Sequence, residues 1–434
     1  MMRSLFSGVS GLTSHQTRMD VIGNNIANVN TIAYKASSVA FSEVFYQTTQ
    51  VASGPNAETA KGGQNAKQIG LGTSVGAIST KVGTEGASQR TDNPFDVKLT
   101  GSGSSFFIVR SNGNTYFTRA GDFKEDANGA LVTQSGANVM GWAVDDNGNV
   151  VRDVVQPLYV RSAEFTYTMP EQTTNLKATG NINSSSANFT VDAAGNQKGE
   201  TMTLSFYDNL GYRYQASISI KQGADAYSYT TEVLAITKEG KPADLTATFN
   251  HNLTFNPTTG ALDAANANLQ FSITGGADAA SFVTNTIDVD ISEMKCIGDE
   301  TKFQYVDVPG KGKAVGKMSS VGIQDDGCIV ASYSNGDTRI IGQIATQSFT
   351  NPAGLEKVGT NMYASTLNSG EFDGIGEAIT NANGKMVSGT IEMSNVDLAT
   401  EFTDMITTQR GFQANSRIIT VSDTLIEELV NLKR

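Results

Sequence analysis

The sequence predicts a mainly β, multidomain protein with β-rich middle domains and a long α-helix at each end. Three observations support this prediction. Near both termini, apolar residues recur every seven positions, which is typical of a helix that packs against another helix. Between the termini, alternating apolar and polar runs are separated by Asn-Gly pairs, which favour tight hairpin turns. The length of 434 residues exceeds one ordinary core, so several domains are expected.

The first predicted helix spans residues 1–30. Its apolar stripe consists of Leu5, Leu12, Met19 and Ile26, widened by Ile22. The helix also contains Gly8, Gly11 and Gly23, and each glycine weakens an isolated helix by about 1 kcal/mol relative to alanine. We therefore expect this helix to be largely unfolded in an isolated chain and to pair as a coiled coil when copies of the protein assemble.

Four asparagines crowd the end of this helix. They are Asn24, Asn25, Asn28 and Asn30. Asparagine tolerates the left-handed backbone conformation that ends helices, so one interpretation of the cluster is a stop signal. The other is that some amides hydrogen-bond across a contact between subunits, where polar groups fix the register of helices. The sequence leaves both interpretations open.

Residues 31–75 are expected to connect the first helix to the β-rich region. Their first part contains enough apolar surface to dock on another element, namely Tyr34, Phe41, Val44, Phe45 and Tyr46. Residues 50–68 are rich in small and polar residues, so they predict a flexible linker or an extended loop.

The middle of the chain predicts two β-domains, one inserted into the other. Residues 76–150 and 319–396 contain short strand candidates between tight turns, and we expect them to form a bipartite inner β-domain. Residues 151–318 differ, because alternation at 201–207 and 214–220 predicts half-buried strands of a sandwich or barrel. This inserted outer β-domain is expected to enter at an exposed loop, with its two ends close together.

The closing helix is predicted over residues 397–434, with Ser394 or Asn395 as its cap. The polymer interface predicted on this helix consists of Leu398, Phe402, Met405, Phe412, Ile419 and Ile426. The neighbouring row is polar at Gln409 and Asp423, so the helix suits several polar-tolerant partners better than one dry core. Two such stripes at opposite termini imply that the ends meet, within one chain or between copies. This pattern points to an assembly device.

The composition argues against several other classes of function. A net charge of −12 disfavours binding to nucleic acid or anionic lipid, and no apolar run is long enough to span a membrane. Two histidines and two cysteines indicate neither a metal site nor a disulfide scaffold, and no cofactor is expected. No segment gathers an acid, a base and a nucleophile, so no catalytic residues are predicted. The N-terminus lacks a signal peptide, which predicts a cytoplasmic protein or export without signal cleavage.

Both ends of the chain resemble bacterial flagellar rod and hook proteins. The stretches Met2-Arg3-Ser4-Leu5-Phe6 and Gln409-Arg410-Gly411-Phe412 are similar to the family's terminal signatures. Between them, Phe117-Thr118-Arg119-Ala120-Gly121 resembles the inner β-domain of the family, and Asn351-Pro352-Ala353-Gly354-Leu355 resembles its hook members in particular. The positions that match the family's motifs include Asn24, Asn25, Asn28, Asn30, Asn395, Asp397, Gln409, Arg410 and Asn415.

The resemblance implies a structural subunit of the flagellar hook that polymerises with itself into a curved, flexible tube carrying torque from rod to filament. It implies that the terminal helices form an inner coiled-coil layer, that the bipartite domain forms the wall and that the inserted domain faces outward. The implied partners are the flagellar rod, the hook cap, the hook–filament junction proteins and the flagellar export apparatus. The implied location is the hook, outside the cell, after export without a cleaved signal peptide.

Three alternatives stay open from the sequence. A distal rod subunit is the nearest, although rod proteins generally lack an insertion as large as 151–318. A secreted β-rich adhesin and a surface hydrolase come from other classes. Cys296 and Cys328 are expected to be ordinary buried thiols, while the resemblance raises a cysteine–lysine link between subunits as an alternative. Ala33 stands where the family commonly has glycine, which puts in doubt a glycine-only backbone conformation there.

Overall fold

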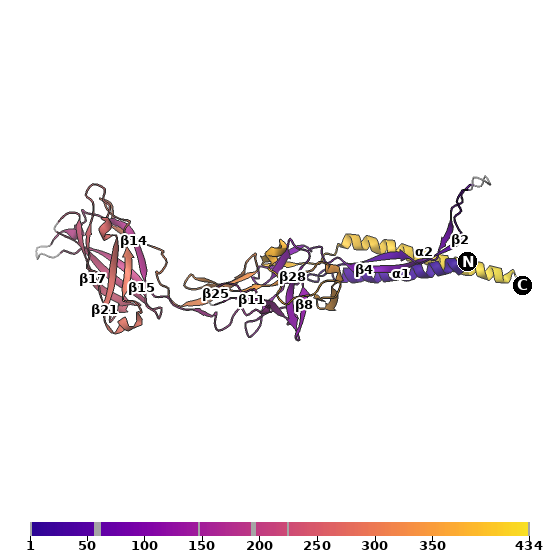
Figure 1. Ribbon diagram of the computed structural model, residues 1–434, viewed down its shortest axis with the longest axis horizontal. Helices are drawn as coiled ribbons and strands as arrows, with labels where there is room; N and C mark the ends of the chain where they lie inside the picture. The colour runs from indigo at the N-terminus through magenta and orange to yellow at the C-terminus, as the bar shows by residue number, and fades with distance from the viewer. Residues whose placement is uncertain (1, 56–61, 146–147, 192–196, 224, 433–434) are drawn as a thin grey trace. The chain divides into compact units, whose positions relative to one another are not determined.

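The structure is a computed structural model in which the chain divides into two compact units (Figure 1). It describes residues 2–55, 62–145, 148–191, 197–223 and 225–432. Unit 1 comprises Met1–Ser162, Val321–Ala331 and Arg339–Arg434, and unit 2 comprises Ala163–Ser320 and Ser332–Thr338. The predicted helices and connecting segment include residues 1, 56–61 and 433–434, which lie outside the described residues.

Two long helices belong to unit 1, α1 (Met2–Ala27) and α2 (Leu398–Asn431), and strands make up most of the regular structure between them. The prediction of a mainly β, multidomain protein with a long helix at each end is therefore confirmed. The predicted cap of α2 was wrong by two or three positions. Asp397 directly precedes the helix, and its carboxylate accepts a hydrogen bond from the backbone N–H of Ala399 at 3.0 Å.

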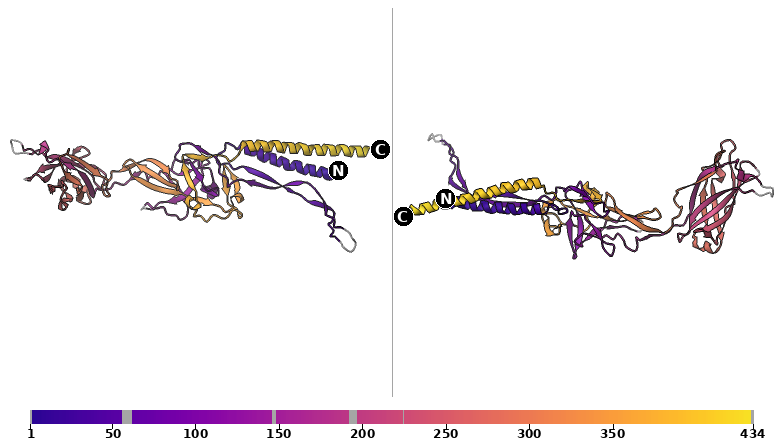
Figure 2. Two further views of the ribbon diagram at one scale, coloured as in Figure 1. Left: turned by 90° about the horizontal axis from the view of Figure 1, so that it is seen from above. Right: turned by 180° about the vertical axis from the view of Figure 1, so that it is seen from behind.

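Strands lie at both ends of the connecting segment, while residues 51–55 and 62–66 of the stretch predicted as a linker or extended loop lie outside the named strands. Strand β1 (Ser37–Glu43) pairs antiparallel with β4 (Thr73–Thr80), and β2 (Tyr46–Gln50) pairs with β3 (Lys67–Gly70). The first ribbon lies along α1 in all three views (Figures 1 and 2). Small residues lower the strand propensity of the connecting segment. The β-branched and aromatic residues in its strands favour strand formation.

The β-part of unit 1 brings together chain segments from both sides of the insertion. Its main sheet runs in the order β27 (Thr338–Ile344), β11 (Asn138–Ala143), β7 (Ser105–Ser111), β8 (Asn114–Thr118), β30 (Met362–Ala364) and β29 (Glu356–Gly359). Its margins hold β9 (Lys124–Glu125), β10 (Leu131–Val132), β12 (Gln156–Pro157) and β28 (Thr346–Ser348). Two short ribbons pair β5 (Ser88–Arg90) with β32 (Thr390–Glu392) and β6 (Val97–Thr100) with β31 (Lys385–Ser388). Short 3₁₀ turns are η4 (Pro352–Gly354) and η5 (Ile379–Ala382).

Aromatic rings fill the core of this β-part. Phe117 packs edge-on against Phe349 with ring centroids 4.8 Å apart, and Phe106 contacts the same ring at 5.8 Å. Trp142 is buried, and its indole N–H donates to the backbone carbonyls of Asp153 and Ile375, each at 3.1 Å. Asp153 precedes unit 2 in the chain and Ile375 follows it, so this one indole ties the two halves of unit 1 together.

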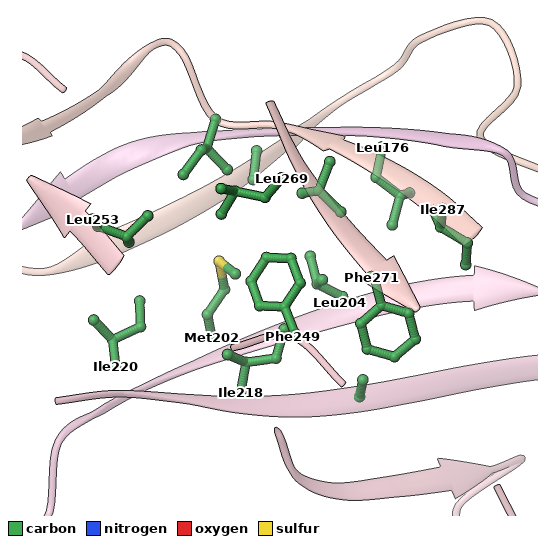
Figure 3. Close-up of a cluster of buried hydrophobic side chains, with 14 of the residues drawn as sticks. Leu176, Met202, Leu204, Ile218, Ile220, Phe249, Leu253, Leu269, Phe271 and Ile287 are labelled. Carbon is green, nitrogen blue, oxygen red and sulfur yellow. The ribbon is translucent and has the colours of Figure 1, made fainter. Parts of the chain in front are cut away.

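Unit 2 is a β-sandwich with its own core (Figure 3). One sheet runs β19 (Thr246–Thr248), β21 (Asn268–Gly275), β22 (Thr286–Asp290), β14 (Asn175–Ile182) and β23 (Met294–Cys296), with β24 (Lys302–Val306) also on β14. The other runs β15 (Glu200–Tyr207), β16 (Arg213–Gln222), β17 (Ser228–Lys238) and β18 (Lys241–Pro242), with β20 (Asn252–Thr254) also on β17. Further elements are η1 (Ala187–Phe189), η2 (Ala264–Asn266), η3 (Ala277–Ser281) and the pair β13 (Tyr167–Thr168) with β25 (Gly316–Ile323).

The core of unit 2 lies between these two sheets. Leu204 and Ile218 come from one sheet and Phe271 and Ile287 from the other, and all four side chains are buried (Figure 3). Strand β15 alternates buried positions with more exposed ones along its length. The alternation at 201–207 and 214–220 therefore predicted the inward face correctly. Strand β26 (Cys328–Tyr333) follows β25 in the chain.

Candidate assembly surface of the terminal helices

Helices α1 and α2 lie side by side and run in opposite directions (Figures 1 and 2). Near the start of α1, Gly8 faces Ile419, and near its end the Asn25 amide donates to the Glu401 carboxylate at 3.1 Å. An ion pair joins Arg18 to Asp404 at 3.1 Å between these two points. The ends of the polypeptide therefore meet within a single chain.

Small and polar residues make the contact between the two helices. A Cβ atom added at Gly11 would lie 2.6 Å from the Asn415 side-chain nitrogen, and one added at Gly411 would lie 2.7 Å from the His15 ring. Real Cβ atoms do not approach so closely, so these glycines permit the spacing of the helices. Two of the three glycines that weaken α1 as an isolated helix, Gly8 and Gly11, thus lie where α2 approaches.

The ribbon of β1 and β4 covers another side of α1. The backbone N–H of Thr73 donates to the Ser10 hydroxyl at 3.3 Å, and the Ser14 hydroxyl donates to the Thr73 carbonyl at 3.4 Å. Further along, the Phe41 ring packs edge-on against His15 at 5.5 Å and lies under the Arg18 guanidinium at 5.9 Å. Serine hydroxyls and one aromatic ring therefore hold the ribbon to the helix.

The predicted interface residues largely flank these contacts. On α1, Ile22 is buried, and Leu5, Leu12, Met19 and Ile26 are half-buried. On α2, Leu398, Phe402 and Phe412 are exposed, and Met405, Ile419 and Ile426 are half-buried. Their apolar surface is thus only partly used within one chain.

Sequence periodicity missed several apolar side chains of the same surface. Phe6 on α1 is 62% exposed, and Ile406 and Val421 on α2 are each 58% exposed. The last turns of α2 add Leu429 and Val430, both exposed. An i, i+3, i+4 search for a wider stripe would have found them, because they flank the seven-residue rows.

Two of the motif asparagines hold the chain where the helices meet the β-part. The Asn25 amide donates to the Ser37 carbonyl at 2.8 Å, and its oxygen accepts from the Ser37 N–H at 3.0 Å. The Asn395 oxygen accepts from the Ala36 N–H at 2.8 Å, and its amide donates to the Lys81 carbonyl at 2.9 Å. Both side chains serve contacts within the chain, which favours an internal role for these two amides.

The other motif residues lie apart from these two. Asn28 donates to the Asn24 carbonyl at 2.9 Å at the end of α1, as a helix stop would. Asn30, Gln409 and Arg410 are exposed, Asn415 lies against Gly11, and Asp397 caps α2. The asparagine cluster therefore combines a stop with a specific internal contact.

A buried charge cluster lies beside these asparagines, and sequence analysis missed it. Glu392 accepts from Lys35 Nζ at 2.7 Å, from Arg119 Nε at 3.1 Å and from the Gly86 N–H at 2.8 Å. All three charged side chains are fully buried. Burial opposes ionisation of Glu392, but the Arg119 and Lys35 charges outweigh it and hold the pKa of the carboxyl below its usual value.

Neither a metal-binding group nor a membrane-spanning helix is found in the described residues. No group of three or more His, Cys, Asp or Glu side chains in them is placed to hold a metal ion. Within the same ranges, neither α1 nor α2 is apolar enough over its length to cross a membrane. Unit 1 does carry exposed apolar side chains on both helices, among them Phe6, Phe402 and Ile406.

Three protein families match parts of the chain, and all of them describe flagellar rod and hook proteins. The family "Flagella basal body rod protein" matches residues 5–35, and "Flagellar basal body rod FlgEFG protein C-terminal" matches residues 387–432. The family "Flagellar hook protein FlgE/F/G D1 domain" matches residues 101–197. The two terminal matches cover most of α1 and all of α2, together with neighbouring residues on the inner side of each helix.

Relatives that match along the whole length of the chain narrow the class of protein further. The flagellar hook protein FlgE of Treponema pallidum is 34% identical over 471 residues, covering 100% of both chains. That of Borreliella burgdorferi is 35% identical over 453 residues with the same coverage. The flagellar basal-body rod protein FlgG of Bacillus subtilis is 30% identical over 434 residues, again covering 100% of both. The chain belongs to the flagellar hook protein family and is a structural subunit of the bacterial flagellar hook.

Proposed function

We propose that this chain polymerises through the exposed apolar faces of α1 and α2, which bury one another between copies. The proposed contact residues are Leu5, Leu12, Met19, Ile26, Leu398, Phe402, Met405, Phe412, Ile419 and Ile426. Ile22, which was also predicted, is already buried within the chain. The helices of neighbouring copies form a coiled-coil layer, and the resulting polymer is a curved tube that carries torque from rod to filament. No catalytic step belongs to this role.

One observation supports this proposal above the others. Where the helices meet, glycines of α1 face the Ile419 and Asn415 side chains of α2, while Phe402, Ile406 and Phe412 lie exposed on α2. Exposed apolar surface of this extent on a helix marks a contact with another macromolecule. Because the chain is a hook subunit, the contact that fits it is another copy, and burial of such side chains stabilises the contact by about 1.5–3 kcal/mol each.

The other parts of the chain have proposed places in this tube. The two β-segments at 76–150 and 319–396 form its wall, and the insertion at 151–318 faces outward. The acidic, Thr- and Asn-rich insertion makes weak, wet contacts that slide as the tube bends. The rod, the hook cap and the hook–filament junction proteins bind at its ends. The chain leaves the cell through the flagellar export apparatus, without a cleaved signal peptide.

Salting-out of the purified protein followed by electron microscopy tests the proposal. Wild-type protein should form curved tubular polymers above a critical concentration. A double variant, Phe402→Ser with Ile406→Ser, should need at least a tenfold higher concentration. The matched control Thr403→Ser with Thr407→Ser lies on the same exposed turns and should polymerise as wild type. Persistent monomers of wild-type protein, or equal polymerisation of both variants, would contradict the proposal.

The distal rod is the second candidate, because the Bacillus subtilis rod protein matches along the whole chain. The shape of the polymer separates the two candidates. Curved tubes support the hook role, and only straight, rigid tubes would favour a rod role.

A further inference from the structure

The His15 side chain lies where three elements of unit 1 meet. Its imidazole ring packs edge-on against Phe41 of β1, with ring centroids 5.5 Å apart. On the side of α2, a Cβ atom added at Gly411 would lie 2.7 Å from the Nε2 atom of the ring. One residue before His15, the Ser14 hydroxyl donates to the Thr73 carbonyl of β4 at 3.4 Å. A single titratable side chain of α1 therefore lies against both α2 and the β1–β4 ribbon.

The Nδ1 atom of the His15 ring is buried and has no hydrogen-bond partner among the described residues. A neutral imidazole carries one proton, so its other nitrogen can remain bare. An imidazolium carries a proton on each nitrogen, and the Nδ1–H group would then be buried without an acceptor. A buried donor without an acceptor is costly, above all when it is charged. The packing around His15 therefore accepts the neutral ring and opposes the charged one.

The charged groups around His15 do not compensate for a proton there. On α1, the Arg18 guanidinium lies one turn further along and is itself positive. On α2, the Asp404 carboxylate is engaged by Arg18 at 3.1 Å, and Arg410 adds another positive charge. Glu43 is the only charged residue of β1, and β4 has none. Burial, and to a smaller extent the Arg18 charge, hold the pKa of His15 below its usual value of 6.5.

We propose that His15 is an acid-sensitive contact: α1 stays packed on α2 and on the β1–β4 ribbon while the imidazole is neutral, and a proton on the ring loosens both contacts. An unpacked α1 takes up this proton at the usual pKa of histidine, which is higher than the pKa of packed His15. The packed arrangement therefore keeps its full stability well above pH 6.5 and loses part of it as pH falls below 6.5. The inference concerns a single chain, so it does not rest on polymerisation.

The composition of the chain confines this response to one place. The sequence contains two histidines, and histidine is the side chain whose usual pKa lies between about pH 5 and pH 8. The other one, His251, belongs to unit 2, where its Nε2 atom lies 2.9 Å from the Gln270 carbonyl oxygen. Mild acidification should therefore act on the helices of unit 1 through His15.

Nuclear magnetic resonance of wild-type monomer carrying carbon-13 at the histidine Cε1 atoms gives the first test. Two signals are expected, and the variant His251→Gln removes one of them and thereby assigns the other to His15. The His15 signal should titrate with a midpoint below pH 6.5. A midpoint at pH 6.5 or above would show that the packed chain accepts the proton, and it would overturn the inference.

Amide hydrogen exchange of the monomer measures the loosening itself. After correction for the intrinsic pH dependence of exchange, the amides of residues 12–22 on α1 and 37–43 on β1 should exchange severalfold faster at about pH 5 than at about pH 7.5. In His15→Phe, whose ring packs but takes up no proton, the two corrected rates should agree. His251→Gln is the control and should keep the difference seen in wild type. Equal wild-type rates at both pH values, or an undiminished difference in His15→Phe, would count against His15 as the acid-sensitive contact.

Discussion

The Glu392 carboxylate and the Lys35 ammonium lie 2.7 Å apart, although 357 positions separate them in the sequence. Lys35 follows α1 and Glu392 precedes α2, so the pair joins the chain at the inner ends of both helices. The Arg119 guanidinium completes the cluster and donates to the Ser102 and Ser105 carbonyls, each at 2.7 Å. One carboxylate therefore connects both helices to the β-part of unit 1.

Substituting Glu392→Gln should lower the free energy of unfolding by about 3–5 kcal/mol, because it leaves Lys35 and Arg119 buried without a counter-charge. Urea denaturation followed by circular dichroism measures this. Glu371→Gln is the control, since Glu371 is exposed, and its effect should stay within about 0.5 kcal/mol. A loss below about 1 kcal/mol for Glu392→Gln would show that the cluster tolerates an unbalanced charge.

The same cluster predicts how stability depends on pH. The pKa of Glu392 lies below its usual value of 4.5 in the folded chain, because the Arg119 and Lys35 charges outweigh the effect of burial. The unfolded chain therefore takes up this proton first, so the contribution of Glu392 is complete above about pH 4.5 and is lost as pH falls through the lower folded pKa. The difference in unfolding free energy between wild type and Glu392→Gln should be constant from pH 5 to pH 7 and shrink below pH 4.5. A difference that grows on acidification would contradict this sign.

Sequence periodicity predicted the helices and the sandwich because regular spacing leaves a visible signal. The stripe from Leu5 to Ile26 marks α1, and the alternation at 201–207 marks an inward sheet face. It did not predict which side of α1 meets α2, because the contact is made by Gly8 and Gly11, which carry no apolar signal. The seven-residue rows indicated apolar surface, and the structure uses that surface only in part.

The strands at 37–80 and the buried charges were not predicted from the sequence, and the reason is different. Strand pairing between β1 and β4 joins residues 30 or more positions apart, and local composition does not record it. Lys35, Arg119 and Glu392 each look like ordinary surface charges in the sequence. Only the fold shows that these three side chains converge and are fully buried. Long-range convergence of this kind is the part of the site that a single sequence does not reveal.

Two glycines of α1, Gly11 and Gly23, should respond in opposite ways to substitution by alanine. Gly11→Ala should destabilise the pairing of α1 with α2 by about 1–3 kcal/mol, because the added Cβ would lie 2.6 Å from the Asn415 side chain. Gly23→Ala is the matched control, since nothing lies within 4 Å of its Cβ, and it should stabilise α1 by about 1 kcal/mol. Hydrogen exchange of the α1 amides measures both effects. Equal and favourable effects of the two substitutions would show that the helices do not pack through Gly11.

Ala33 adopts a backbone conformation that favours glycine. Its φ is +55°, in the left-handed region, and its N–H donates to the Glu392 carbonyl at 2.8 Å. The sequence left it open whether position 33 adopts a backbone conformation that favours glycine. Ala33 does adopt that conformation, and its Cβ atom makes the backbone there strained. Ala33→Gly should raise the free energy of unfolding by about 0.5–1 kcal/mol. The neighbouring buried Ala36 has no such strain, so Ala36→Gly should lower it by about 1 kcal/mol in the same urea titration.

The two cysteines should be unreactive in the native chain. Both are buried free thiols, and the Cys296 sulfur lies 3.4 Å from the Tyr229 hydroxyl. Burial, with a smaller contribution from Asp326, raises the pKa of the Cys328 thiol to about 12, so almost none of it is the reactive thiolate at neutral pH. Titration with Ellman's reagent should release two equivalents of thionitrobenzoate rapidly from denatured protein and at least a hundredfold more slowly from native monomer. One rapidly reacting thiol in the native monomer would contradict the buried-thiol interpretation and favour a role for that cysteine in linking subunits.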